Sequence, residues 1–154
     1  MMFTKSVVWQ SAVSKFDYSS WPDLKGRWGV TVINNSFGQE FDAYAKQNLN
    51  LLTVASLEQA LSMLGAGRAD FVLYEKNPGA AYVQKMGLEN VVSAVEPAIS
   101  SEGLFLTISK ESPCNTLELK NKIATALREL VDESVPQYVL VDALTEWREG
   151  PSKL

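Results

Sequence analysis

The chain has 154 residues, of which 46% are hydrophobic, and a formal charge of −4. This length and composition predict one ordinary domain, or one complete lobe with an appendage, with a real core, and they argue against a disordered chain. Acids and bases are interspersed without a basic stripe, which argues against nucleic acid as the main partner. No apolar run approaches the roughly 20 residues that span a bilayer, and residues 1–5 lack the features of a signal peptide.

The content of cysteine and histidine narrows the possible chemistry. Cys114 is the single cysteine, so neither an intramolecular disulfide nor a cysteine-based zinc site is possible. The sequence contains no histidine, so the commonest general base and metal ligand are both missing. We therefore expect no metal site, no cofactor and no catalytic residues, and an enzyme is the least favoured class of function.

Strands and helices alternate through the first two thirds of the chain. The patterns predict strands at 3–9, 28–33, 50–55, 70–74 and 90–95, a helical turn at 21–26, and helices at 39–47, 56–64 and 78–86. Asn77 and Pro78 are typical of an N-cap followed by the first helical residue. Strands separated by such helices imply right-handed crossovers, a mostly parallel sheet and helices on both faces. The expected fold class is therefore α/β with three layers.

The pattern changes after Pro97. A further strand is expected at 103–109, and two amphipathic helices occupy the rest of the chain. Ser134 and Pro136 mark the start of the second helix. We therefore divide the chain into an α/β lobe at 1–110 and C-terminal helices at 111–154.

Two polar features follow strands and are expected at one edge of the sheet. Glu75 ends the strand 70–74, and ligands of open α/β sheets bind outside the carboxyl ends of strands. The loop 34–38 precedes a helix N-terminus, whose free N–H groups suit a carboxylate or phosphate, whereas a glutamate suits an ammonium or guanidinium. Together they would bind a zwitterion. Alternatively, Glu75 is a capping or solvated turn residue and the loop is an ordinary N-cap. We expect Glu40 and Asp42 to be solvated rather than catalytic carboxylates.

Several segments carry a resemblance to a known family. In this order they resemble the second lobe of the family 3 extracellular solute-binding proteins, which serve ABC transporters, mostly for polar amino acids. The segments are Asp23–Val30, Asn34–Gly38, Ser56–Leu61, Gly65–Asp70 and Gly103–Ser109. The resemblance extends from about residue 3 to residue 147, and it is the ordered set that is specific.

This resemblance implies the fold of one lobe of a type II periplasmic binding protein. Residues 3–9 and 103–109 resemble the two crossover strands, and the last helices resemble those that pack on the first lobe. By position, Asn35 and Ser36 match the loop that helps to hold a ligand carboxylate, and we include Phe37 with them as ligand-binding. Glu75 matches the acidic residue that takes the α-amino group. The first lobe, with the arginine that usually clamps the carboxylate, has no counterpart in this sequence.

The first functional hypothesis is a solute-binding module of an amino-acid uptake system in a truncated or single-lobe form. The resemblance implies a periplasmic location, a small polar ligand such as an amino acid, and ABC transporter membrane subunits as partners. The alternative is a non-catalytic interaction or self-association protein that has lost ligand binding. The apolar stripes of the C-terminal helices lack the first lobe that would cover them, so we also expect a homodimer through these helices.

Overall fold

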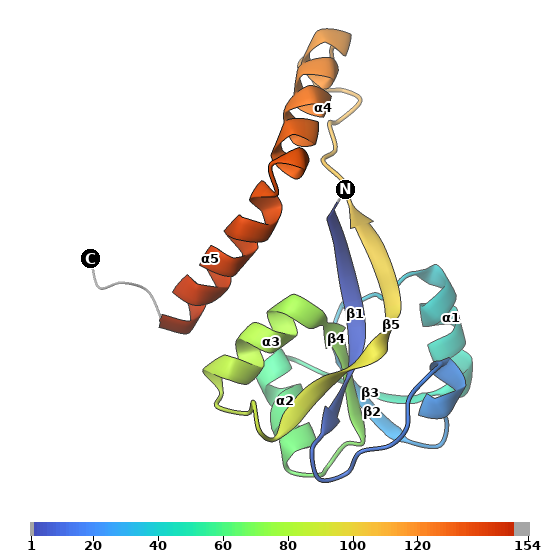
Figure 1. Cartoon of the computed structure of the whole chain (residues 1–154). Coiled ribbons are helices and arrows are strands. Elements are labelled where there is room, and N and C mark those ends of the chain that lie inside the picture. Colours follow the sequence, from blue (N-terminus) through green and yellow to red (C-terminus); the bar gives the residue numbers. More distant parts are fainter. Residues whose placement is uncertain (1, 150–154) are drawn as a thin grey trace. The chain divides into compact units, whose positions relative to one another are not determined.

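A computed structural model describes residues 2–149, which fall into two compact units (Figure 1). Thr4–Glu102 forms one unit, and the chain from Gly103 onward forms the other together with the first residues. The sequence pattern places this change at residue 110.

The elements alternate in chain order as expected. They are β1 (Met2–Ser11), a 3₁₀ turn η1 (Trp21–Leu24), β2 (Trp28–Val32), α1 (Gln39–Asn48), β3 (Asn50–Val54), α2 (Leu57–Gly65), β4 (Phe71–Glu75), α3 (Lys76–Lys85), β5 (Val92–Leu104), α4 (Leu117–Asp132) and α5 (Val135–Glu149). Ser56 caps α2, because its hydroxyl accepts a hydrogen bond of 3.2 Å from the Gln59 amide.

Five strands form one sheet in the order β3-β2-β4-β1-β5. β2 is parallel to both β3 and β4, and Gly29 lies opposite Phe71. β1 runs antiparallel to β4, with Val8 opposite Leu73. The predicted α/β class is confirmed, and the parallel strands are the adjacent trio β3, β2 and β4. Because β2 and β4 are parallel, the loops that follow them emerge at the same edge of the sheet.

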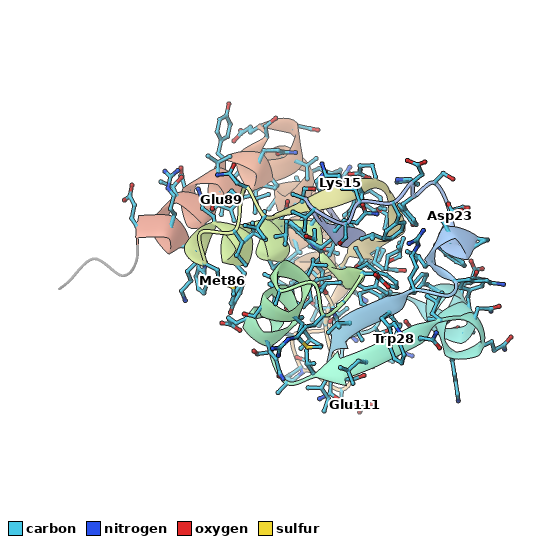
Figure 2. All side chains as sticks on the ribbon, turned by 90° about the horizontal axis from the view of Figure 1, so that it is seen from below. Lys15, Asp23, Trp28, Met86, Glu89 and Glu111 are labelled. Carbon is cyan, nitrogen blue, oxygen red and sulfur yellow. The ribbon has the colours of Figure 1, made fainter. Side chains whose placement is uncertain are left out.

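Alternating side chains of β4 divide the core between the two faces of the sheet. Val72 packs on one face with residues of α2 and α3, among them Leu61, Leu64 and Val83. Phe71 and Leu73 pack on the other face with residues of η1 and α1, which are Leu24, Phe41 and Ala45. Figure 2 shows side chains filling the space between the sheet and the helices on both sides. Helices therefore cover both faces, which is the three-layer arrangement expected from the sequence.

Two predicted boundaries are wrong. α3 begins at Lys76, so Asn77 and Pro78 lie inside its first turn and Glu75 takes the N-cap position. The strands expected at 90–95 and 103–109 are replaced by the continuous strand β5, and residues 105–109 have no regular structure. β5 continues through Pro97 because it is an edge strand, where a residue without an N–H group interrupts no ladder on the open side.

The unit that begins at Gly103 contains α4 and α5. The Thr116 hydroxyl accepts a hydrogen bond of 3.2 Å from the Leu119 amide and caps α4. Neither helix contains a buried residue within the described chain. Their apolar stripes are therefore largely exposed. None of the helices in residues 2–149 combines the length and the apolar character needed to cross a membrane.

Candidate functional site at the carboxyl edge of the sheet

Glu75 is the last residue of β4 and lies at the junction with α3. Its backbone angles, φ −62° and ψ 140°, are those of an extended N-cap residue, but its side chain makes no capping hydrogen bond. The carboxylate is half-buried. The alternative interpretation of Glu75 as a capping side chain is therefore not supported, and its Oε2 instead accepts a hydrogen bond from Asn35.

Asn35 reaches Glu75 from the neighbouring strand. β2 ends at Val32, and Asn34 turns the chain with a left-handed φ of 63°, a conformation that asparagine tolerates better than most residues. The Asn35 amide nitrogen then donates to the Val32 carbonyl at 3.2 Å. Its side-chain Nδ2 donates to Glu75 Oε2 at 3.4 Å. The prediction that these residues share one edge of the sheet is confirmed.

Asp42 of α1 holds the rest of the loop that follows β2. Its Oδ2 accepts a hydrogen bond of 2.5 Å from the Ser36 hydroxyl, and its Oδ1 accepts one of 3.0 Å from the Phe37 amide. Besides meeting solvent, this carboxylate therefore ties the loop to the first turn of the helix. The Phe37 side chain is buried and its ring meets that of Phe41 edge-on at 5.7 Å, so it belongs to the core. Ligand binding by Ser36 and Phe37 stays a prediction.

A second carboxylate lies at the N-terminus of α1. Gly38 occupies the N-cap position with a φ of 94°, so no side chain caps this helix from there. Glu102 Oε1 lies 2.7 Å from the position that a Cβ atom on Gly38 would take. Both residues line a hollow of about 270 Å³ together with Gln39 and Glu40. A carboxylate there is stabilised by the partial positive charge of the helix N-terminus.

Sequence reasoning missed the roles of Asp42 and Glu102. Asp42 carries a recognisable signal, since it is an acidic residue in the first turn of a predicted helix just after a polar loop. Glu102 carries none, because its approach to Gly38 joins segments that are far apart in the sequence.

No salt bridge of Glu75 is found among residues 2–149. Lys76 is adjacent in the chain, but its Nζ binds Glu96 Oε1 at 2.7 Å, and this hydrogen bond lowers the pKa of Glu96. Neither of the two ion pairs found in residues 2–149 involves Glu75. The pKa of Tyr74 is raised mainly by burial and next by the charge of Glu75. The site therefore presents a carboxylate that can accept hydrogen bonds from a cation.

Across positions 2–149, no group of three or more histidine, cysteine, aspartate or glutamate side chains could hold a metal ion. Cys114, a free thiol, is exposed in the other unit. The arrangement can hold a ligand through charge-assisted hydrogen bonds.

Comparisons with known proteins give a likeness of fold. No family model and no curated protein matches the sequence. Among solved structures, a mutant of ArgBP from T. maritima is 21% identical with a TM-score of 0.66, covering 94% of this chain and 59% of that one. The GluR0 ligand-binding core from Nostoc punctiforme in complex with L-glutamate is 21% identical with a TM-score of 0.63, covering 92% and 61%.

A third similar structure is the amino acid ABC transporter substrate-binding protein AbpA from Streptococcus pneumoniae, bound to L-arginine. It is 16% identical with a TM-score of 0.63, and the match covers 97% of this chain and 60% of that one. The chain thus spans about 60% of the length of the structures it resembles. At these identities the likeness establishes that the chain has the fold of amino-acid-binding proteins of this kind, and the ligand has to be argued from the site.

Proposed function

We propose that this chain is a solute-binding module that holds a small polar ligand, such as an amino acid, at the carboxyl edge of its sheet. The observation that carries the proposal is the hydrogen bond between Asn35 and Glu75. These residues follow and end two neighbouring parallel strands, at the edge of the sheet where ligands of α/β folds bind. The fold likeness to ligand-binding proteins supports it. In this proposal the module serves ABC transporter membrane subunits in the periplasm and catalyses no reaction.

Titration of the ¹⁵N-labelled chain with a panel of amino acids tests this proposal. We expect at least one ligand to shift the amide resonances of Asn35 and Glu75 in a saturable way. Glu75→Gln keeps the shape of the side chain but removes its charge, so it should cost about 1.5–3 kcal/mol of binding free energy. Glu89→Gln is the matched control, because Glu89 is exposed between α3 and β5 (Figure 2) and should leave binding unchanged. Equal affinities for the two variants would contradict a role for Glu75.

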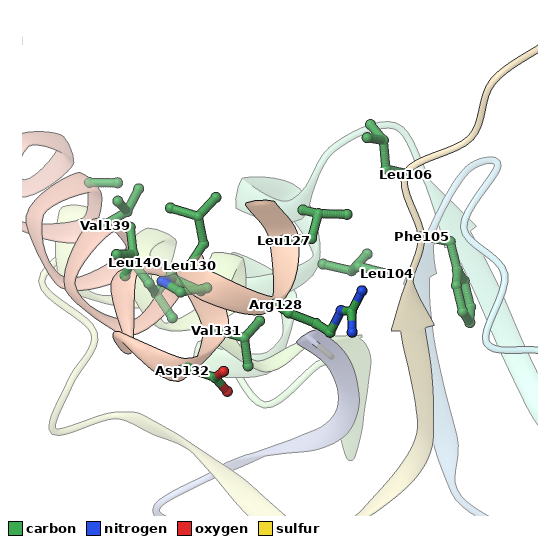
Figure 3. Close-up of a pocket in the computed structure, with 13 residues that line it drawn as sticks. Leu104, Phe105, Leu106, Leu127, Arg128, Leu130, Val131, Asp132, Val139 and Leu140 are labelled. Carbon is green, nitrogen blue, oxygen red and sulfur yellow. The ribbon is translucent and has the colours of Figure 1, made fainter. Parts of the chain in front are cut away.

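A second candidate function, self-association, is favoured by an observation in the other unit. Leu104, Leu106 and residues of α4 and α5 line an apolar groove of about 780 Å³ (Figure 3). All of its lining side chains are apolar except Arg128 and Asp132. A soluble monomer rarely leaves more than a few hundred Å² of contiguous apolar surface uncovered. We propose a second copy of the chain as the occupant of this groove, in a homodimer that buries α4 and α5.

Two substitutions on one helix test the homodimer. Val139 lines the apolar groove and is 58% exposed, whereas Val141 does not line it and is 62% exposed. We expect light scattering to give a dimer mass for the unchanged chain, a monomer mass for Val139→Lys, and a dimer mass for Val141→Lys. A monomer mass for the unchanged chain at micromolar concentration would contradict self-association.

A further inference from the structure

Resting on the proposed solute-binding function, we infer that the ligand is recognised as a cation, an amine or a guanidine, and that this chain does not bind a ligand carboxylate. A zwitterion site needs an acceptor for the cationic group and free donors for the carboxylate. Glu75 supplies the acceptor. Two donors of the loop after β2 are already occupied by Asp42, and the carboxylate of Glu102 lies at the N-terminus of α1.

The first occupied donors belong to the loop after β2. The Ser36 hydroxyl and the Phe37 amide both donate to Asp42, which uses one oxygen for each. An incoming carboxylate could take these donors only by displacing Asp42 from both of them. That exchange replaces one carboxylate by another at the same donors, so it gains no hydrogen bond.

A second carboxylate lies beside the N-terminus of α1. An N-cap serine or threonine would offer a hydroxyl to an anion, but Gly38 has no side chain. The Glu102 carboxylate instead lies against Gly38, with Oε1 at 2.7 Å from the Cβ position. The helix N-terminus carries about half a positive charge, which one carboxylate already outweighs. A second anion at this end of α1 would meet the charges of Glu102 and Asp42.

The acceptor for a cation, by contrast, has unused capacity. Asn35 Nδ2 donates to Glu75 at 3.4 Å, a long hydrogen bond, and a carboxylate can accept about four hydrogen bonds. Lys76, the cation next to Glu75 in the chain, is bound to Glu96. An ammonium or guanidinium that binds Glu75 would therefore compete with no internal ion pair found in the described chain.

Pairs of ligands that differ only in the carboxylate test the inference. Agmatine is arginine without its carboxylate, and cadaverine stands in the same relation to lysine. In NMR titrations of the full chain, we expect agmatine to bind about threefold or more tightly than arginine, because the extra negative charge of arginine meets Asp42 and Glu102. Cadaverine should likewise bind more tightly than lysine. Glu75→Gln should lower the affinity for agmatine about tenfold or more, while the control Glu89→Gln should leave this affinity unchanged.

The possible results separate this inference from the function on which it rests. Arginine that binds more tightly than agmatine, with Glu75→Gln weakening it, would overturn the inference and leave solute binding intact. No saturable shift with any of the four compounds or with the amino-acid panel would overturn both. Glu102→Gln provides an independent check, since removing its charge should move the affinity ratio toward arginine. An unchanged ratio would overturn the role assigned to Glu102.

Discussion

Gly29→Ala places a methyl group where three strands of the parallel trio have no space for it. An added Cβ atom would lie 2.3 Å from Cζ of Phe71 and 2.5 Å from Cδ2 of Leu51. Carbon atoms in favourable contact are about 3.5–4.0 Å apart, so each neighbour would have to retreat by more than about 1 Å. Phe71 is fully buried in the cluster on the α1 face and has no open space to enter.

Two effects of opposite sign decide the result of this substitution. Glycine inside a strand costs roughly 0.5–1 kcal/mol relative to alanine, so conformational entropy alone predicts that Gly29→Ala stabilises the fold. Overpacking a well-packed core costs typically about 1–3 kcal/mol. Because the clash involves a buried ring and the backbone of a central strand, we expect overpacking to win. The net loss should be about 1–2 kcal/mol, which lowers the Tm by about 2–8 °C for a chain of this length.

Thermal and urea unfolding followed by circular dichroism measure this loss. Gly65→Ala is the matched control, because the added Cβ would lie 3.5 Å from Val91 Cγ1, an ordinary contact, at the end of α2. It should be neutral or stabilise the chain by up to about 1 kcal/mol. If Gly29→Ala raised the Tm as well, the close approach of Phe71 to β2 would be refuted.

Two further predictions concern polar contacts of the same unit. Ser56→Ala removes the hydroxyl that caps α2, so it should lower the free energy of unfolding, measured in urea, by about 1 kcal/mol. An unchanged urea midpoint would show that the hydrogen bond between Ser56 and Gln59 contributes nothing to stability. The pKa of Asp23 in the folded chain is lowered chiefly by hydrogen bonds from Ser19. The charged Asp23 therefore stabilises the fold at pH values above its pKa in the unfolded chain, near 3.9, and this stabilisation is lost as the pH falls through the lower pKa of the folded chain. Between about pH 5 and about pH 2.5, the Tm of the unchanged chain should therefore fall more than that of Asp23→Asn, and parallel curves would contradict the assignment.

The alternation of strands and helices was sufficient to predict that Asn35 and Glu75 lie at one edge of the sheet. Parallel neighbours must end at the same edge, so the placement of Glu75 near Asn35 follows from sequence patterns alone. Whether the hydrogen-bond donors of the loop after β2 are free or occupied could not be predicted in the same way. Ser36 is polar and precedes a helix, a pattern that fits a free donor and an occupied one equally well. The choice depends on Asp42, whose place in the first turn of α1 the sequence indicates but whose hydrogen bonds to the loop it does not.

The course of β5 shows a second limit of sequence reasoning. Pro97 inside an apolar and polar alternation predicts a break when the strand has neighbours on both sides. At the edge of the sheet the same proline is tolerated, and β5 continues to Leu104. The position of a strand within a sheet depends on pairing between distant segments, so local pattern cannot decide it.

Every buried residue of the described chain lies between Ser6 and Ile99, within the unit Thr4–Glu102, here called the α/β unit. Residues 103–149 contain no buried residue. Burial of apolar area is the main favourable term in folding, so the core of this unit should not depend on α4 and α5. We therefore predict that a chain shortened to residues 1–104 unfolds cooperatively, with a Tm within about 4 °C of the full chain, an interval that corresponds to a change of about 1 kcal/mol. Near-ultraviolet circular dichroism reports the packing of Trp9 and Trp21, so loss of that signal in the shortened chain would mean that the C-terminal helices help to form the core.

The same shortened chain should lose the dimer mass, because the apolar groove is made by residues 104–143. A shortened chain that still dimerised would place the self-association surface on the α/β unit instead.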